Sequence, residues 1–358
     1  MSGHNSGALM PYGLTNDIAE RFEAFDAPRA ALPGRVRQSS LAHSFVVVPG
    51  GDHLVHHSNP RTKTSGGTND VPVTGDWVVV NPDPSSGYTI IGILPRYSVL
   101  ARQKAGDRLA RQVLAANVDS VFVVHALDRP VNQGRLERML VMVWAGGGRP
   151  VVILTKVDIA SDTTKDSTWA QLATIAPGCP IHVTSAITGE GVATLAQYTT
   201  RNETVALIGE SGAGKSQLVN RLVGTDVQSV AAVRASDHKG RHATTTRDLV
   251  PLPNGGVLLD TPGLRGVGLW DADEGLDLAF PEIALAALGC RFSDCAHESE
   301  PGCTVRSAVM NGDVDARRLE RFLRLDRELD ERKREHVQQG RRTPGRPSRP
   351  RWSGRDDD

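Results

Sequence analysis

One short segment constrains the fold of this chain more than any other. Gly209-Glu-Ser-Gly-Ala-Gly-Lys-Ser216 follows the apolar run Thr204–Ile208 and precedes a helical pattern over Gln217–Val223. A glycine-rich loop between a strand and a helix turns backbone N–H groups toward a phosphate, and the helix dipole favours the negative charge. The segment predicts a phosphate-binding loop in which Lys215 reaches the β- and γ-phosphates and Ser216 binds Mg²⁺. The nucleotide-binding residues expected here are Gly209, Glu210, Ser211, Gly212, Ala213, Gly214, Lys215, Ser216 and Gln217.

A second motif, Asp260-Thr-Pro-Gly263, closes the apolar run that begins at Gly256. The carboxylate of Asp260 can hold Mg²⁺ through water, and the amide of Gly263 can sense the γ-phosphate. A Pro-Gly turn after a strand is common, so this motif alone is a weak signal. It becomes a strong one because it lies at the expected distance downstream of the phosphate-binding loop. Together the two motifs predict a site for a nucleotide with Mg²⁺.

The base is predicted to be recognised upstream of both. Thr155-Lys-Val-Asp158 follows the apolar run Val151–Leu154, and Thr184-Ser-Ala186 ends the next run. A carboxylate at Asp158 accepts hydrogen bonds from guanine N1 and the 2-amino group, whereas adenine would leave it unpaired at a cost of about 1–3 kcal/mol. We expect the stem of Lys156 to pack along the base and a backbone amide of the second motif to meet guanine O6. The residues assigned to guanine are Thr155, Lys156, Asp158, Ser185 and Ala186.

The order of these motifs is unusual. In ordinary GTPases the phosphate-binding loop comes first and the guanine motifs come last, whereas here the guanine motifs precede Gly209–Ser216. A sheet accepts such a permutation when the original termini lie close in space. The chain is therefore predicted to be a circularly permuted GTPase. The loop after Gly263 then runs directly into the C-terminal region, and we expect it to carry the nucleotide state there.

The sequence around these motifs predicts an α/β domain. Continuous apolar runs are typical of strands that are buried on both faces, and their alternation with helices indicates a mainly parallel sheet with helices on both faces. We expect strands at Ser120–Val124, Pro150–Leu154, Pro180–Thr184, Thr204–Ile208 and Gly256–Asp260, and helices at Gln133–Trp144, Ser167–Ile175, Val192–Tyr198 and Gln217–Val223.

The N-terminal part has a different pattern. Short β-type runs separated by Gly, Pro and Asn predict a small β-barrel between about Pro33 and Pro95. The stretch His53–Asn69 between them is interpreted as a polar loop. The predicted runs are Ser44–Val48, Asp76–Val80 and Tyr88–Leu94.

Helices dominate after Leu276, and a cluster of cysteines interrupts them. Cys290, Cys295, His297 and Cys303 offer three thiolates and one imidazole within a short segment, which is a complete tetrahedral shell for one structural Zn²⁺. The competing interpretation is a set of unrelated buried cysteines.

Charge and hydropathy limit the partners and the compartment. Lys plus Arg and Asp plus Glu both number 41, so total charge indicates no partner. From His336 to Arg355 there is no acidic residue, and six arginines lie among Gly, Pro and Ser. Such a tail is predicted to be disordered and either to contact nucleic acid or to act as a solubilising extension. There is no signal-peptide pattern and no apolar run of membrane-spanning length, so a cytoplasmic protein without membrane contact is expected.

These residues resemble a known family, the ribosome small-subunit-dependent GTPases of the RsgA (YjeQ/EngC) type. The resemblance runs from about Pro33 to Leu329 and includes Thr74-Gly-Asp-Trp-Val78, Gln112–Asp119, Cys290–His297 and Glu300-Pro-Gly-Cys303. It implies an OB-fold, a permuted GTPase domain and a zinc domain, with GTP hydrolysis stimulated by the small ribosomal subunit and release from it after late maturation. The expected divisions are an N-terminal extension at 1–32, an OB-fold at 33–100, the GTPase domain at 101–275, a helical zinc-binding domain at 276–335 and a disordered arginine-rich tail at 336–358.

The resemblance also directs attention to the catalytic water. Leu264 stands where Ras-like enzymes carry a water-orienting Gln, so slow intrinsic hydrolysis is expected. The family pattern points instead to His242, which could orient or deprotonate water, contact RNA or cap its loop. Thr245 is the expected switch ligand of Mg²⁺. Thr155 replaces the commoner Asn of the guanine motif, and we expect this to weaken the tie to the phosphate-binding loop.

The expected partners are GTP and GDP, the small ribosomal subunit and its rRNA, and the protein is expected to be a monomer. Two alternatives remain at this point. One is a guanine-nucleotide-regulated RNA-binding checkpoint protein in which hydrolysis matters little. The other is a switch for a non-ribosomal partner.

Overall fold

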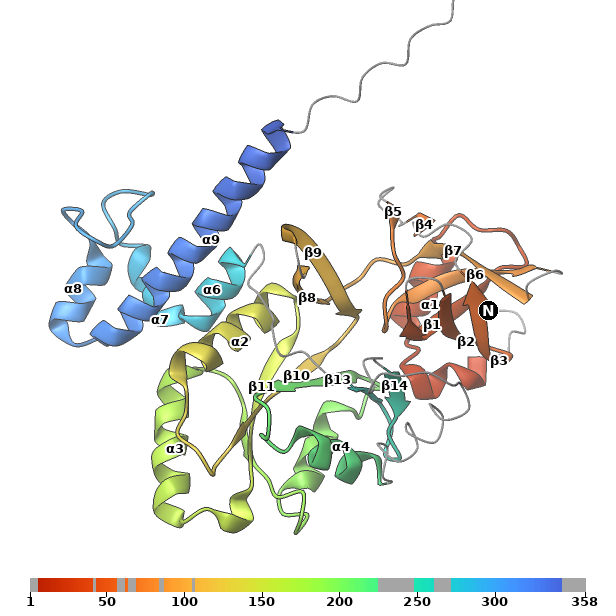
Figure 1. Ribbon diagram of the computed structural model, residues 1–358, viewed down its shortest axis with the longest axis horizontal. Helices are drawn as coiled ribbons and strands as arrows, with labels where there is room; N and C mark the ends of the chain where they lie inside the picture. Colours follow the sequence, from red (N-terminus) through yellow and green to blue (C-terminus); the bar gives the residue numbers. More distant parts are fainter. Residues whose placement is uncertain are drawn as a thin grey trace, which may run out of the picture.

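The computed structural model describes residues 6–40, 43–56, 62–63, 69–83, 87–104, 107–224, 248–260 and 272–342. They form an N-terminal β-region, a central sheet flanked by helices, and a C-terminal group of helices (Figure 1). Two 3-10 turns, η1 (Ser6–Ala8) and η2 (Met10–Tyr12), and helix α1 (Asn16–Glu23) precede the first strand. Ile18 of α1 packs with Leu9 and Trp77 in one core of the β-region. The N-terminal segment therefore covers the β-region rather than trailing from it.

Five antiparallel strands in the order β3-β2-β1-β6-β7 form the N-terminal β-region. The two edge strands come together, because the ring centroids of His53 on β3 and Tyr88 on β7 lie 4.7 Å apart. The sheet therefore curls into a barrel, whose interior includes Val36, Val46 and Val78. This arrangement confirms the predicted OB-fold. The strands are β1 (Leu32–Ser39), β2 (His43–Val48), β3 (Gly51–His56), β6 (Trp77–Asp83) and β7 (Gly87–Ile93).

Two strands of the barrel, β1 and β3, were not among the predicted runs. In β1 the apolar alternation is broken by Gly34, where an added Cβ would lie 2.7 Å from Val46 Cγ1. The interpretation of His53–Asn69 as a polar loop is wrong at its start, because β3 pairs with β2 along its whole length and buries Val55. Within the same stretch, β4 (Thr62–Lys63) pairs with β5 (Asn69–Asp70). Backbone pairing with a neighbouring strand, rather than apolar content, makes these segments extended.

The hairpin β8 (Val99–Lys104) and β9 (Asp107–Ala116) follows the barrel and precedes the central sheet, and the boundary predicted between residues 100 and 101 falls within β8. The barrel also contacts the sheet directly. Arg35 of β1 is buried, and its Nη2 donates to the carbonyl of Asn117 and the hydroxyl of Thr204, both at 3.2 Å. Arg37 of β1 pairs with Asp248 at 2.8 Å. The barrel is thus held directly against the central sheet.

The central sheet has six strands in the order β12-β11-β10-β13-β15-β14. All neighbours are parallel except β14 and β15, so the predicted mainly parallel sheet is confirmed with one antiparallel edge strand. Every residue of β10 and β13 is buried, as expected for strands covered on both faces. The strands are β10 (Ser120–Ala126), β11 (Arg149–Thr155), β12 (Ile181–Val183), β13 (Thr204–Gly209), β14 (Asp248–Pro251) and β15 (Val257–Asp260).

Helices cover both faces of this sheet. One face carries α2 (Gln133–Ala145) and α3 (Asp162–Ile175), whose Leu140 and Leu172 share a core with Phe280 and Leu325 of the C-terminal region. The other face carries the 3-10 segment η4 (Val192–Tyr198) and helix α4 (Lys215–Val223). The C-terminal helices therefore extend the core of the first face instead of forming an isolated body.

The C-terminal helices are α6 (Asp273–Ala279), α7 (Pro281–Ala287), α8 (Thr304–Asn311) and α9 (Ala316–Arg342). Helix α9 is amphipathic and buries Leu319, Phe322, Leu325 and Leu329. It continues to Arg342, so the first part of the predicted tail, from residue 336, is helical. Among the described helices, none is long and apolar enough to cross a membrane.

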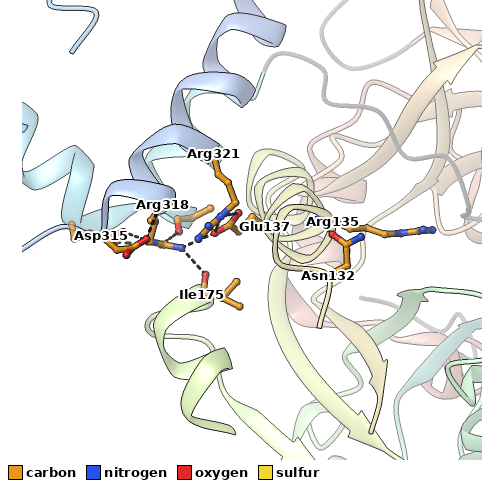
Figure 2. Close-up of polar contacts among 9 residues, drawn as sticks. Asn132, Arg135, Glu137, Ile175, Asp315, Arg318 and Arg321 are labelled. Carbon is orange, nitrogen blue, oxygen red and sulfur yellow. Dashed lines mark hydrogen bonds and ion pairs between the residues drawn. The ribbon is translucent and has the colours of Figure 1, made fainter. Parts of the chain in front are cut away.

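A buried polar cluster joins α2 to this C-terminal region (Figure 2). The carboxylate of Glu137 is fully buried and accepts from Arg318 Nη1 at 3.1 Å and from Arg321 Nε at 2.7 Å. Arg318 also pairs with Glu282 and donates to the carbonyl of Ile175 at 3.1 Å. One buried arginine of α9 therefore contacts α2, the end of α3 and α7 at once.

Candidate functional site

The predicted phosphate-binding loop connects β13 to α4. Gly209, Gly212 and Gly214 all have positive φ angles, of 146°, 75° and 84°. At Gly209 an added Cβ would lie 2.3 Å from the carbonyl oxygen of Val124, so the loop needs glycine there for space as well as for backbone conformation. Helix α4 begins at Lys215, directly after the loop. The loop thus meets the N-terminus of a helix, the arrangement that favours a bound anion.

The two polar residues at the start of α4 differ in their surroundings. Lys215 Nζ donates to the carbonyls of Gly209 at 2.9 Å and Glu210 at 2.6 Å, so its ammonium group lies within the curve of the loop. Ser216 and Gln217 are exposed on the first turn of α4. Their side chains are accessible to a ligand in the loop.

The guanine motif at the end of β11 contacts this loop. The hydroxyl of Thr155 donates to the carbonyl of Ala213 at 2.6 Å, and Thr155 is 2% exposed. A direct hydrogen bond thus connects the two motifs with threonine in place of the commoner asparagine, and the weaker tie expected from the sequence stays a prediction.

Lys156 and Asp158 follow in a turn. Lys156 has a φ of 63°, and the 3-10 segment η3 (Val157–Ile159) comes directly after it. Asp158 is exposed, so its carboxylate is accessible to a base. The amide of Val157 donates to the carbonyl of Thr184 at 3.3 Å, which links this turn to the second guanine motif.

The second guanine motif is a compact turn after β12. Ser185 is buried, and its hydroxyl accepts hydrogen bonds from the amides of Ile187 at 3.2 Å and Thr188 at 3.1 Å. Ala186 lies between these groups and is half-buried. Ser185 thus has a local structural role, because it holds the turn that presents the neighbouring amides.

The magnesium motif begins at the end of β15. Asp260 is the last residue of this strand, which runs parallel to β13 with Leu259 opposite Ala206. The predicted phosphate, base and magnesium motifs therefore all lie at the carboxyl edge of the sheet, although they are far apart in sequence. His242, Thr245 and Gly263 lie outside the described residues, as does Leu264.

Asp128 and Arg129, which lie in the turn between β10 and α2, were not predicted from the sequence. Asp128 accepts from Lys156 Nζ at 2.5 Å and from Arg129 Nε at 2.8 Å. The hydrogen bonds from Arg129 and Lys156 hold the pKa of Asp128 well below its usual range. Arg129 also donates to carbonyls of the phosphate-binding loop, at Ser211 (3.1 Å) and Gly212 (3.4 Å). No sequence pattern marks an ionic turn of this kind.

The four predicted metal ligands converge between α7 and α8. Ligand atoms of Cys290, Cys295, His297 and Cys303 all lie within 4.8 Å of one another. His297 Nδ1 is 3.6 Å from Cys290 Sγ and 3.5 Å from Cys303 Sγ, and these two sulfurs are 4.0 Å apart. A tetrahedral site with Zn–S near 2.3 Å and Zn–N near 2.0 Å requires separations of about 3.5–3.8 Å. The cluster can therefore hold a metal ion, and its dimensions fit zinc.

Two further residues shape the metal cluster and were not predicted. The carboxylate of Glu300 accepts from the amides of Ala296, Glu298 and Ser299 at 3.0–3.1 Å, and these backbone hydrogen bonds lower its pKa. The loop around His297, which has a φ of 61°, is thereby held in place. Thr304 donates to the carbonyl of Ala286 at 2.5 Å, so it ties the start of α8 to α7. Glu300 belongs to the segment Glu300–Cys303 of the family resemblance, but its role in holding this loop was not predicted.

Comparisons with known proteins agree with this geometry. A family model described as RsgA GTPase matches residues 93–270. The "Small ribosomal subunit biogenesis GTPase RsgA" of Streptomyces avermitilis is 44% identical over 90% of this chain and 86% of its own length. A protein of the same description from Methanosarcina acetivorans is 40% identical over 92% of this chain and 88% of its own length.

Solved structures are similar as well. The crystal structure of YjeQ from Thermotoga maritima matches with a TM-score of 0.63 and 26% identity, covering 84% of this chain and 98% of that chain. YloQ, described as a circularly permuted GTPase, matches with a TM-score of 0.61 over 86% of this chain and 98% of that chain. At 22% identity the second likeness supports the fold alone.

Proposed function

We propose the following function on the basis that the chain belongs to the RsgA GTPase family. The protein hydrolyses GTP to GDP and phosphate, and the small ribosomal subunit stimulates this reaction during late maturation of that subunit. The observation that carries the proposal is the meeting of a phosphate-binding loop, a guanine motif and a magnesium motif at one sheet edge, in permuted order. The printed names of the relatives support the ribosomal part.

The phosphate side of the site is assigned to the loop Gly209–Ser216. Its amides and the N-terminus of α4 bind the phosphates, and Lys215 leaves its present contacts with Gly209 and Glu210 to reach them. Ser216, Asp260 and Thr245 are the proposed residues for Mg²⁺, which when bound neutralises charge that develops on the phosphates. The exposed position of Ser216 on α4 supports its assignment.

The base side is assigned to Asp158, Lys156 and the turn at Ser185-Ala186. The exposed carboxylate of Asp158 accepts from guanine N1 and the 2-amino group, and a backbone amide of the Ser185-Ala186 turn donates to guanine O6. The hydrogen bonds from Thr155 to Ala213 and from Val157 to Thr184 support one rigid site, because they connect the phosphate loop and both guanine motifs.

His242 is the proposed group that orients or deprotonates the attacking water, since Leu264 cannot. The test is His242→Ala, assayed with small subunits at concentrations that saturate binding. Loss of stimulated turnover with unchanged subunit binding is the expected result. Undiminished turnover would remove His242 from the mechanism and leave it a role in RNA contact or loop capping.

The metal cluster is proposed to hold one structural Zn²⁺. Three thiolates and one imidazole leave no open position for a water or a substrate, so catalysis at this ion is not expected. The site lies between α7 and α8, which supports a role in folding the C-terminal region.

The nucleotide state is proposed to reach the C-terminal region through the segment after Gly263, which leads directly to α6. The OB-fold and the arginine-rich tail are the proposed contacts with rRNA phosphates, and the protein acts as a cytoplasmic monomer. Hydrogen exchange in residues 280–335 should therefore differ between the GDP-bound and GTP-analogue-bound protein. Identical exchange in the two states would remove the proposed transmission.

The function is tested by measuring GTP hydrolysis with the protein alone, with isolated small subunits and with isolated large subunits. Stimulation by small subunits alone is the expected result. Stimulation by neither, with GTP still bound, would contradict the ribosomal role and indicate a switch for another partner. Absence of GTP binding would contradict the enzymatic assignment itself.

A further inference from the structure

The turn between β10 and α2, residues 127–132, is fixed at both ends. The amide of Leu127 donates to the carbonyl of Thr155 at 3.0 Å, so the turn begins beside the guanine motif. The imidazole of His125 is 7% exposed, and its Nε2 lies 3.2 Å from the carbonyl of Arg129. Since a carbonyl can only accept, Nε2 carries the proton. Asn132 ends the turn by capping α2, because its side chain accepts from the amide of Arg135 at 3.1 Å. The backbone at residues 128 and 129 is therefore preorganised.

Arg129 connects this turn to the phosphate-binding loop. Its Nε donates to Asp128 Oδ1, while Nη1 and Nη2 reach the carbonyls of Ser211 and Gly212. These two carbonyls belong to the part of the loop that reverses direction, where Gly212 has its positive φ. Amides that face a phosphate require their carbonyls to point elsewhere, and here a planar guanidinium binds them. Arg129 thus supports the loop from the side opposite the expected phosphates.

Asp128 connects the same turn to the guanine motif. Its Oδ2 accepts from Lys156 Nζ at 2.5 Å, while Oδ1 accepts from Arg129. A lysine that ends on a fixed carboxylate has its four-carbon stem held in one direction, and the stem of Lys156 is the proposed surface for the base. The Lys156 stem and the Ser211-Gly212 backbone are therefore connected through one ion triad.

We propose that Asp128 and Arg129 are positioning residues of the nucleotide site. Arg129 holds the phosphate-binding loop in its open curve, and Asp128 holds the stem of Lys156 where the base packs. Both effects exist before the nucleotide arrives, so they lower the ordering cost of binding and slow dissociation. The inference rests on the proposed function, since it assigns guanine nucleotide to the same site.

An ordinary surface ion pair is the competing explanation. Exposed pairs usually contribute about 0–1 kcal/mol to stability, and the side chains of Asp128, Arg129 and Lys156 are 24–33% exposed. That explanation does not account for the contacts of Arg129 with two carbonyls of the phosphate-binding loop, or for the contact of Asp128 with the lysine of the guanine motif. The two explanations predict different effects of substitution. A positioning role predicts faster nucleotide dissociation, whereas a surface ion pair predicts only a slight change in folding stability.

The test measures dissociation of a fluorescent GDP analogue from the full chain, with Mg²⁺ present. Asp128→Asn and Arg129→Ala are each expected to raise the dissociation rate by about 5- to 20-fold. Arg129→Lys should not restore the wild-type rate, because an ammonium group cannot bind Asp128 and two carbonyls as the guanidinium fork does. The double variant should dissociate no more than about twofold faster than the worse single variant, since both residues act through one triad.

The matched control is Arg149→Ala. Arg149 pairs with Glu203 at 2.7 Å, but it starts β11 and so lies at the opposite end of the sheet from the site. This variant should change the dissociation rate less than twofold, and melting of all nucleotide-free variants should stay close to wild type. Wild-type rates in the Asp128 and Arg129 variants, or equal acceleration in the control, would overturn the inference. If the wild-type protein binds no GDP, the proposed function fails instead.

Discussion

Glu137→Ala is expected to loosen the C-terminal region from the GTPase domain. Glu137 is fully buried and is the partner of two arginines, with Arg318 3% and Arg321 16% exposed in their side chains. Removing one partner of a buried ion pair typically costs about 3–5 kcal/mol, because the remaining charge is left uncompensated. Arg318 retains Glu282 and two backbone carbonyls, so we expect the lower end of this range.

The assay is amide hydrogen exchange of α9 around Arg318 and Arg321, which reports local opening of the C-terminal region. A loss of about 3 kcal/mol lowers protection there by roughly two orders of magnitude. Glu137→Gln keeps the side-chain volume and should lower protection almost as much, since the missing charge dominates. Glu328→Ala is the matched control. Its pairs with Arg138 and Arg332 are a quarter to a third exposed, so it should cost no more than about 1 kcal/mol. Equal protection in Glu137→Ala and Glu328→Ala would refute the reasoning.

Two further substitutions test the nucleotide site and the metal cluster. Thr155→Val keeps the side-chain shape but leaves the carbonyl of Ala213 without its hydroxyl donor. The affinity for GDP, measured by calorimetry, should therefore fall by about 5- to 30-fold, while the preference for guanine over xanthine stays unchanged. An unaltered GDP affinity would contradict this expectation. Purified protein should contain one zinc per chain by elemental analysis, and Cys295→Ser should lower this content and melt the region around α7 and α8 while GDP binding persists; full zinc content in that variant would argue against Cys295 as a ligand.

The parts of the fold that were predictable from sequence carry strong local patterns. Strands β10, β11 and β13 are continuous apolar runs in the sequence, because helices cover both faces of the sheet. The glycine-rich loop also predicted the strand before it and the helix after it. The metal cluster was equally predictable, since its four ligands lie close together in the chain. Strand β1 was not predictable, because its buried positions include Gly34, which lies against Val46 of the barrel, and Arg35, whose partners Asn117 and Thr204 lie outside the barrel.

The residues that sequence reasoning missed depend on distant partners. Glu137 lies in α2 beside Arg138 and resembles any polar helix position, yet α9 buries it. Asp128 and Arg129 form an ordinary charged pair until the fold brings Lys156 and Ser211 to them. The hydrogen bond from Thr155 to Ala213 likewise joins residues far apart in the chain, so it could not be predicted from the sequence. Local chemistry was predictable, whereas contacts between elements far apart in the sequence were not.

The central claim is that a motif upstream of the phosphate-binding loop reads the base of a nucleotide held by that loop. Asp158→Asn tests it most directly, in a competition between GDP and XDP for the purified protein. Xanthine carries a carbonyl where guanine carries the 2-amino group, so an amide at this position can donate where the carboxylate accepted. The wild-type protein should prefer GDP, and Asp158→Asn should prefer XDP, with a change in the ratio of about two orders of magnitude or more. The control Asp162→Asn, at an exposed position of α3, should keep the wild-type order. An Asp158→Asn protein that still prefers GDP would contradict the account.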